Sequence, residues 1–137
     1  MVDHRMTLSH LVARVNRRIE GSLSQRLKAE GLSLEHYRIL AALVEEDGRT
    51  MSDLASWAMV DPPTMTKMID RLVASGCVFR APDPDDRRKV LVFISDVGRS
   101  VYKAAEAPAM AFEEELGNVL PAVDRAELTR LLQNLLK

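Results

Sequence analysis

Polar side chains suited to contact nucleic acid gather in two nearby segments of this 137-residue sequence. The first, Pro62 to Arg71, carries two threonines, a lysine and an arginine, and helical spacing would leave polar side chains on one side. The second, Asp83 to Lys89, ends in three consecutive basic residues and lies between two short apolar runs. Hydroxyl, ammonium and guanidinium groups are the side-chain donors that reach phosphate oxygens and base edges. The two segments therefore predict a helix that enters the major groove of duplex DNA, followed by a cationic β-hairpin, or wing.

The charge of the chain is distributed unevenly along the sequence. Its 19 lysines and arginines and its 20 aspartates and glutamates give a formal net charge of −1, so the chain is not basic as a whole. Affinity for DNA must then come from local placement of charge. Six basic residues fall close together in the middle third, whereas four glutamates lie toward the C-terminus: Lys67, Arg71, Arg80, Arg87, Arg88 and Lys89 against Glu106, Glu113, Glu114 and Glu115. A charge cluster alone is commonly a solvated surface, so the architecture has to support the interpretation.

Capping residues indicate where the elements that position these side chains begin. The candidate N-caps are Ser33, Thr50, Asp61 and Ser95. They predict helices over about 33–46, 50–58, 61–75 and 96–117. Pro62 and Pro63 fit the first turn of the third of these helices, where a missing N–H costs nothing. Residues 77–80 and 89–94 are rich in β-branched and aromatic side chains and flank the polar tip, which predicts the two strands of the hairpin.

Both ends of the chain predict helices whose apolar faces need a partner. Apolar residues recur at helical spacing from about 7 to 29, and five leucines form a dense stripe on a helix that starts near Ala122. Pro108 lies inside the long predicted helix over about 96–117, and we expect it to kink that helix. The terminal faces could pack on the core or on a second copy of the chain. We favour the second copy, because two recognition helices about 34 Å apart would read a pseudo-palindromic DNA site.

These elements predict a single domain over residues 1–137 that is mainly α with a small β-wing. A winged helix-turn-helix core occupies about 33–95, with dimerisation helices at about 7–29 and 96–137. The hydrophobic content of 47% supports a core of this size. The sequence shows neither a signal-peptide core nor an apolar run long enough to cross a bilayer, so we expect a soluble cytoplasmic protein.

Three stretches of the sequence resemble the MarR family of bacterial winged-helix regulators: residues 31–43, the helix pair from Thr50 to Arg71, and the run from Asp83 to Gly98. Their ordered combination is far more specific than a helix-turn-helix pattern alone, and the resemblance extends over most of the chain. It implies a homodimer built from the terminal helices that binds double-stranded palindromic operators, usually represses transcription, and loses affinity on binding a small ligand or on oxidation. Ala58 and Met59 stand where such sequences commonly carry leucine and glycine.

The resemblance also implies roles for individual residues. The positions that match the major-groove helix are Pro63, Thr64, Thr66, Lys67 and Arg71. Arg88, next to Arg87, matches the wing-tip arginine that enters the minor groove, and Asp86 matches the acid that holds this arginine in place. A guanidinium is planar and permanently charged, which suits a narrow electronegative groove. Asp70 and Arg71 could instead belong to an intramolecular ion pair, so the role of Arg71 stays open.

The resemblance also implies an effector site, which would lie between the dimer helices and the winged core. Its expected lining is His10, Arg14, His36, Tyr37 and Arg38. A histidine or arginine there could pair with the carboxylate of a small aromatic or lipophilic anionic effector. The same residues could instead be ordinary polar side chains at a helix junction, which is the interpretation that the sequence favours.

Other functional classes find little support in the sequence. It contains no phosphate loop, nucleophile motif or metal-ligand spacing, so we expect neither an enzyme nor a bound metal or cofactor. The single cysteine, Cys77, excludes an internal disulfide, and we interpret it as a small buried apolar residue rather than a redox sensor. The main alternative is a winged-helix module that binds a protein, although such a module has no need for the adjacent basic residues of the wing.

Overall fold

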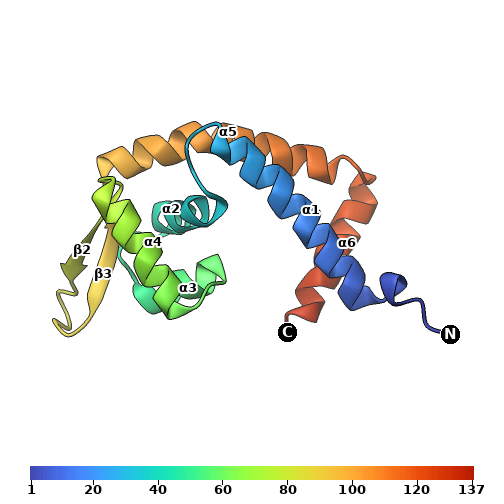
Figure 1. Cartoon of the computed structure of the whole chain (residues 1–137), viewed down its shortest axis with the longest axis horizontal. Helices are drawn as coiled ribbons and strands as arrows, with labels where there is room; N and C mark the ends of the chain where they lie inside the picture. Colours follow the sequence, from blue (N-terminus) through green and yellow to red (C-terminus); the bar gives the residue numbers. More distant parts are fainter.

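The computed structural model describes all 137 residues, which form six α-helices, one short 3₁₀ helix and a three-stranded sheet. In chain order these are η1 (His4–Met6), α1 (Leu8–Lys28), α2 (Leu34–Glu45), β1 (Arg49–Thr50), α3 (Met51–Ala58), α4 (Pro62–Ala74), β2 (Val78–Pro82), β3 (Val90–Ile94), α5 (Asp96–Gly117) and α6 (Ala122–Leu135). Figure 1 shows α5 spanning the molecule, with α2, α3, α4 and the strands beneath its N-terminal half and α1 and α6 toward its other end. The predicted fold class is confirmed.

Each of the four predicted N-caps begins a helix. The side-chain oxygens of Ser33, Thr50, Asp61 and Ser95 accept hydrogen bonds of 3.1, 3.1, 2.7 and 3.0 Å from the backbone N–H groups three residues later. Such bonds satisfy donors that have no partner inside the helix. Asp61 thus fixes the start of α4 even though prolines follow it at the first two helical positions.

The sheet is antiparallel, in the order β1-β3-β2. The hairpin of β2 and β3 was predicted, and its register pairs Val78 with Ile94 and Phe79 with Phe93. The sequence did not predict β1, which pairs Arg49 and Thr50 with β3. Two residues are too few to show a strand periodicity, and the side chain of Thr50 already serves as a helix cap.

The hydrophobic core lies where α2 meets α3, α4, α5 and the sheet. Its fully buried large side chains are Leu27, Ile39, Leu40, Leu43, Leu54, Met65, Ile69 and Val92. Cys77 is buried among them, which confirms the expectation that it is a packing residue by position. Helical spacing in the sequence also predicts that Val44 and Val73 share the packing faces of α2 and α4. This prediction is wrong, because each valine lies at the edge of its face and is exposed.

The helical arms leave their apolar side chains uncovered within one chain. Leu128, Leu131, Leu132, Leu135 and Leu136 on the α6 segment are 42% to 88% exposed, and no residue of α6 is buried. On α1, Val12 and Val15 are also exposed, and only Leu27 near its C-terminal end is buried. Pro108 lies inside α5, which continues through it to Gly117; the expected bend stays a prediction.

Ion pairs attach α1 to the rest of the molecule. The guanidinium of Arg26 pairs with Glu115 and lies 5.3 Å from the centre of the Phe112 ring, both on α5. Arg38 on α2 pairs with Glu20 at 3.3 Å. The C-terminal half of α1 is thus held against α5 and α2, whereas its N-terminal half extends away from the core (Figure 1).

Candidate nucleic-acid interface

The helix α4 separates into a packing face and an exposed face, as its sequence predicts. Met65, Ile69 and Leu72 are buried against the core. Pro63, Thr66, Lys67 and Arg71 are exposed, and Thr64 is half-buried. The five predicted major-groove residues therefore lie on the solvent side of α4 or at its border.

The two threonines already make local hydrogen bonds. The backbone N–H of Thr64 donates to Asp61 at 2.7 Å. Hydrogen bonding from the Thr64 side chain, and then from this N–H, lowers the pKa of the Asp61 carboxyl, so the cap is ionised near neutral pH. The hydroxyl of Thr66 donates to the carbonyl of Pro62 one turn earlier, at 3.1 Å. With its proton engaged, the Thr66 oxygen is available mainly as an acceptor, which suits a base amino group better than a phosphate.

Lys67 and Arg71 form no ion pair within the chain, whereas Asp70 does. Its carboxylate pairs with the guanidinium of Arg80 on β2. Of the two residues considered for an intramolecular pair, Asp70 is therefore the one that forms it. The charge of Arg71 lies close enough to His36 on α2 to add to the effect of burial, and together they lower the pKa of His36.

The wing tip is organised by its own backbone and aspartates. The backbone N–H of Asp83 donates to the Lys89 carbonyl at 3.0 Å, and that of Lys89 donates to the Asp86 carbonyl at 2.9 Å, which closes the loop. The Asp86 carboxylate accepts from the Arg88 backbone N–H at 3.1 Å. Asp86 thus holds Arg88 through the main chain, and the side chains of Arg87 and Arg88 stay exposed and unpaired.

The predicted effector residues do not form one pocket within a single chain. His36, Tyr37 and Arg38 follow one another on α2, whereas His10 and Arg14 lie on the exposed half of α1. Arg14 lines a pocket of about 470 Å³ formed by α1 residues alone. Arg38 is engaged by Glu20, and Tyr37 is buried against α5.

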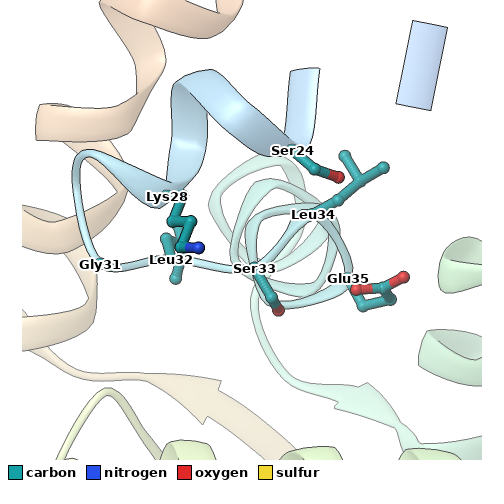
Figure 2. A pocket seen from close by; sticks show the side chains of 7 residues that line it. All are labelled: Ser24, Lys28, Gly31, Leu32, Ser33, Leu34 and Glu35. Atoms are coloured by element: carbon teal, nitrogen blue, oxygen red, sulfur yellow. The ribbon is translucent and has the colours of Figure 1, made fainter. Parts of the chain in front are cut away.

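A second pocket, of about 430 Å³, lies at the junction of α1 and α2 and contains none of the five predicted effector residues. Its lining residues are Ser24, Lys28, Gly31, Leu32, Ser33, Leu34 and Glu35. Figure 2 shows Lys28 and Glu35 on opposite sides of it, with Ser33 between them. It is open to solvent and mainly polar in side-chain type, so it lacks the apolar enclosure typical of a small-molecule site.

Sequence reasoning missed several side chains that hold the interface together. Arg49 is buried; its Nε donates to the carbonyls of Ala42 and Glu46 at 2.8 and 3.0 Å, and it pairs with Asp53 at 2.9 Å. It thereby ties the end of α2 to the start of α3. The only local signal was the i,i+4 spacing to Asp53, which many exposed pairs share.

Tyr102 on α5 was also missed. Its ring stacks on that of Tyr37 with centroids 5.5 Å apart. Burial, Tyr37 and the nearby Glu106 raise the pKa of the Tyr102 hydroxyl to about 12. The pair joins the core to the long helix, a contact between segments 65 positions apart that no local pattern reveals.

No three His, Cys, Asp or Glu side chains come together as a possible metal site. None of the helices combines the length and apolar character needed to span a membrane.

An exposed polar helix beside a basic hairpin, both carried by a compact helical core, defines a winged helix-turn-helix protein. Comparisons with known proteins identify its family. A model described as MarR family matches residues 32–90. An HTH-type transcriptional regulator of Mycobacterium tuberculosis is 34% identical over 127 residues, which cover 93% of this chain and 87% of that protein.

Solved structures agree over the whole length. A mutant MarR from Escherichia coli in complex with operator DNA has a TM-score of 0.89 at 27% identity, covering 99% of this chain and 100% of that one. CouR from Rhodococcus jostii bound to p-coumaroyl-CoA has a TM-score of 0.85 at 25% identity, covering 95% and 92%. The chain belongs to the MarR family of DNA-binding transcriptional regulators and is not an enzyme.

Proposed function

We propose that the protein binds a pseudo-palindromic operator as a homodimer and represses transcription by occupying it. The observation that carries the proposal is the pair of neighbouring cationic elements: Lys67 and Arg71 on α4 have no carboxylate partner, and Arg88 is presented by a wing tip that its own hydrogen bonds close. Unpaired cations on a rigid framework can neutralise phosphates without first breaking internal ion pairs. A dimer covering a promoter would exclude other proteins from it.

In the proposed complex the residues of α4 and of the wing have different tasks. Thr64 and Thr66 lie in the N-terminal half of α4, the part of a recognition helix that reaches base edges. Lys67 contacts phosphate and contributes affinity that is largely independent of sequence. Arg88, with Arg87 beside it, enters the adjacent minor groove, where a narrow groove concentrates negative potential.

Uncovered leucines support the dimer. Water-exposed stripes of this size are unusual on a stable monomer, and each leucine that becomes buried contributes about 1.5–3 kcal/mol. The stripes lie on the arms, at the opposite end of α5 from the wing (Figure 1). A second copy packed there would leave both DNA-binding faces free.

We also propose that a small aromatic or lipophilic anion lowers affinity for the operator. His36 and Tyr37 lie on α2, which also packs against α5, and Arg71 of the recognition helix lies near His36. An anion bound beside them could alter the position of α4 relative to the arms, provided that it favours one dimer conformation by a few kcal/mol. His10 and Arg14 would join such a site from the partner subunit. Similarity to the complex of E. coli MarR with operator DNA supports the proposed DNA binding, and similarity to CouR bound to p-coumaroyl-CoA supports the proposed effector binding.

Selection of bound duplexes from a random DNA pool at physiological salt tests the proposal. Wild-type protein should enrich a pseudo-palindrome, and Arg88→Ala should bind it more weakly by about 1–3 kcal/mol while remaining dimeric. Arg130→Ala on α6 is the matched control, because it removes one arginine already paired with Glu127 far from the wing. If wild type enriches nothing, the protein-interaction module becomes the better hypothesis.

A further inference from the structure

One carboxylate lies on the exposed face of the recognition helix, in the middle of the cationic surface. Asp70 is the only acidic residue of α4, between Lys67 and Arg71 in the sequence. A negative charge on a helix that approaches phosphates opposes binding. Asp70 does not stand alone, however, because its carboxylate pairs with Arg80.

Arg80 comes from the wing and reaches back to the helix. It lies on β2 in register with Val92, on the sheet face that also carries the buried Val78 and packs against α4. The Arg80 side chain is 34% exposed and the Asp70 side chain 59%. An ion pair this exposed adds little to stability, so a structural role alone does not account for a carboxylate at this position.

The position of the pair suggests its role in binding. Adjacent major and minor grooves are separated by one phosphate backbone. A protein with α4 in the first groove and the wing in the second must straddle that backbone, and the Asp70–Arg80 pair lies at the junction of these two elements. An unpaired arginine there would bind phosphate on DNA of any sequence.

We propose that Asp70 sets the sequence-independent part of DNA affinity: it keeps Arg80 away from the phosphate backbone and so limits binding to DNA of any sequence, non-operator DNA included. The pair is electrically neutral, whereas Lys67, Arg71 and the wing-tip arginines keep their charge. Affinity then depends more on base and groove contacts, which differ between sequences, than on phosphate contacts, which do not. This inference rests on the proposed DNA-binding face.

The test is the salt dependence of binding to a mixed-sequence 30-base-pair duplex, measured for wild type and Asp70→Asn. One added phosphate contact steepens the slope of log affinity against log salt by about 0.9. We expect this change in Asp70→Asn, with about three- to tenfold tighter binding near 0.1 M salt both to the mixed duplex and to the selected operator. Because a phosphate contact forms on any sequence, the ratio of operator to mixed-sequence affinity should stay at the wild-type value.

Two further variants separate this role from a merely structural one. In Asp70→Asn/Arg80→Gln the slope should return to the wild-type value, because the released arginine is gone. Glu127→Gln is the matched control, since it removes one carboxylate from an arginine pair on α6 and should leave the slope unchanged.

An unchanged slope in Asp70→Asn would overturn the inference, and so would a gain confined to one of the two duplexes. If wild type binds neither duplex, the proposed function fails as well, which is a distinct outcome.

Discussion

The winged core and the helical arms satisfy their apolar side chains in different ways. In the core, Leu40, Leu43 and Ile69 are completely buried by neighbours from the same chain. In the arms, the leucines of α6 have no such neighbours. A hydrophobic face that is left in water costs the free energy that burial would have provided. The winged core is therefore packed within one chain, whereas the arms are covered only in the proposed dimer. Under that proposal, stability should depend on protein concentration only through the arms.

The largest expected effect comes from Leu132→Asp in the middle of the α6 stripe. Burying an unpaired carboxylate in the proposed interface should prevent association, halve the mass measured by sedimentation equilibrium and weaken operator binding about 100-fold or more through loss of the second reading head. The matched control is Gln133→Asp, which places the same charge on the other side of the helix, beside Thr129 and Arg130. Leu132→Asp protein that retains the wild-type mass would show that α6 packs elsewhere.

A glycine in the core and a glycine in an arm provide a second contrast. A Cβ at Gly98 would lie 2.1 Å from the Cys77 carbonyl oxygen, whereas nothing lies within 4 Å of the corresponding atom at Gly21 on α1. Gly98→Ala should lower the free energy of unfolding by about 1–3 kcal/mol, because the start of α5 must move away from the wing. Gly21→Ala should raise it by about 0.5–1 kcal/mol.

Chemical denaturation at two protein concentrations checks both substitutions. The loss in Gly98→Ala should be the same at each concentration, since it arises inside one core. If Gly98→Ala is as stable as wild type, the close contact with Cys77 does not constrain the core.

Local patterns in the sequence account for most of the elements but few of the contacts between them. Ser33, Asp61 and Ser95 could be recognised as caps because their hydrogen bonds close within three residues. The partner of Asp70 could not be recognised in this way, because Arg80 belongs to a different element, ten positions further along the chain. Pairing of this kind is decided by how α4 packs on β2.

The candidate DNA face also combines features that the sequence predicts with contacts that only the structure reveals. Resemblance to a family placed the exposed residues of α4 and the wing tip, and their solvent exposure agrees with it. It did not reveal that Asp86 holds Arg88 through the backbone N–H rather than through the guanidinium. The five predicted effector residues are not brought together within one chain, since His10 and Arg14 lie on the exposed half of α1 and the other three lie on α2.

The smallest expected effect concerns Met59, an exposed residue with a strained backbone in a turn of the winged core. Met59 closes α3 in the left-handed conformation, with φ 56° and ψ 45°, and its side chain is 71% exposed. A residue with a Cβ pays about 1–2 kcal/mol for this conformation, and little burial is lost when the side chain is removed. Met59→Gly should therefore raise the free energy of unfolding by up to about 1 kcal/mol.

The adjacent substitution Ala58→Gly makes a comparable change at a buried helical position and should have the opposite sign, since glycine there costs about 1 kcal/mol and leaves space behind. The denaturant midpoints of the two variants test these opposite changes in the free energy of unfolding. If Met59→Gly is instead destabilising, the exposed methionine makes a contact that outweighs its backbone strain. Met59 is exposed within one chain, so such a contact would have to come from a second chain. The measurement at two protein concentrations would then show whether the turn belongs to the core or to the dimer.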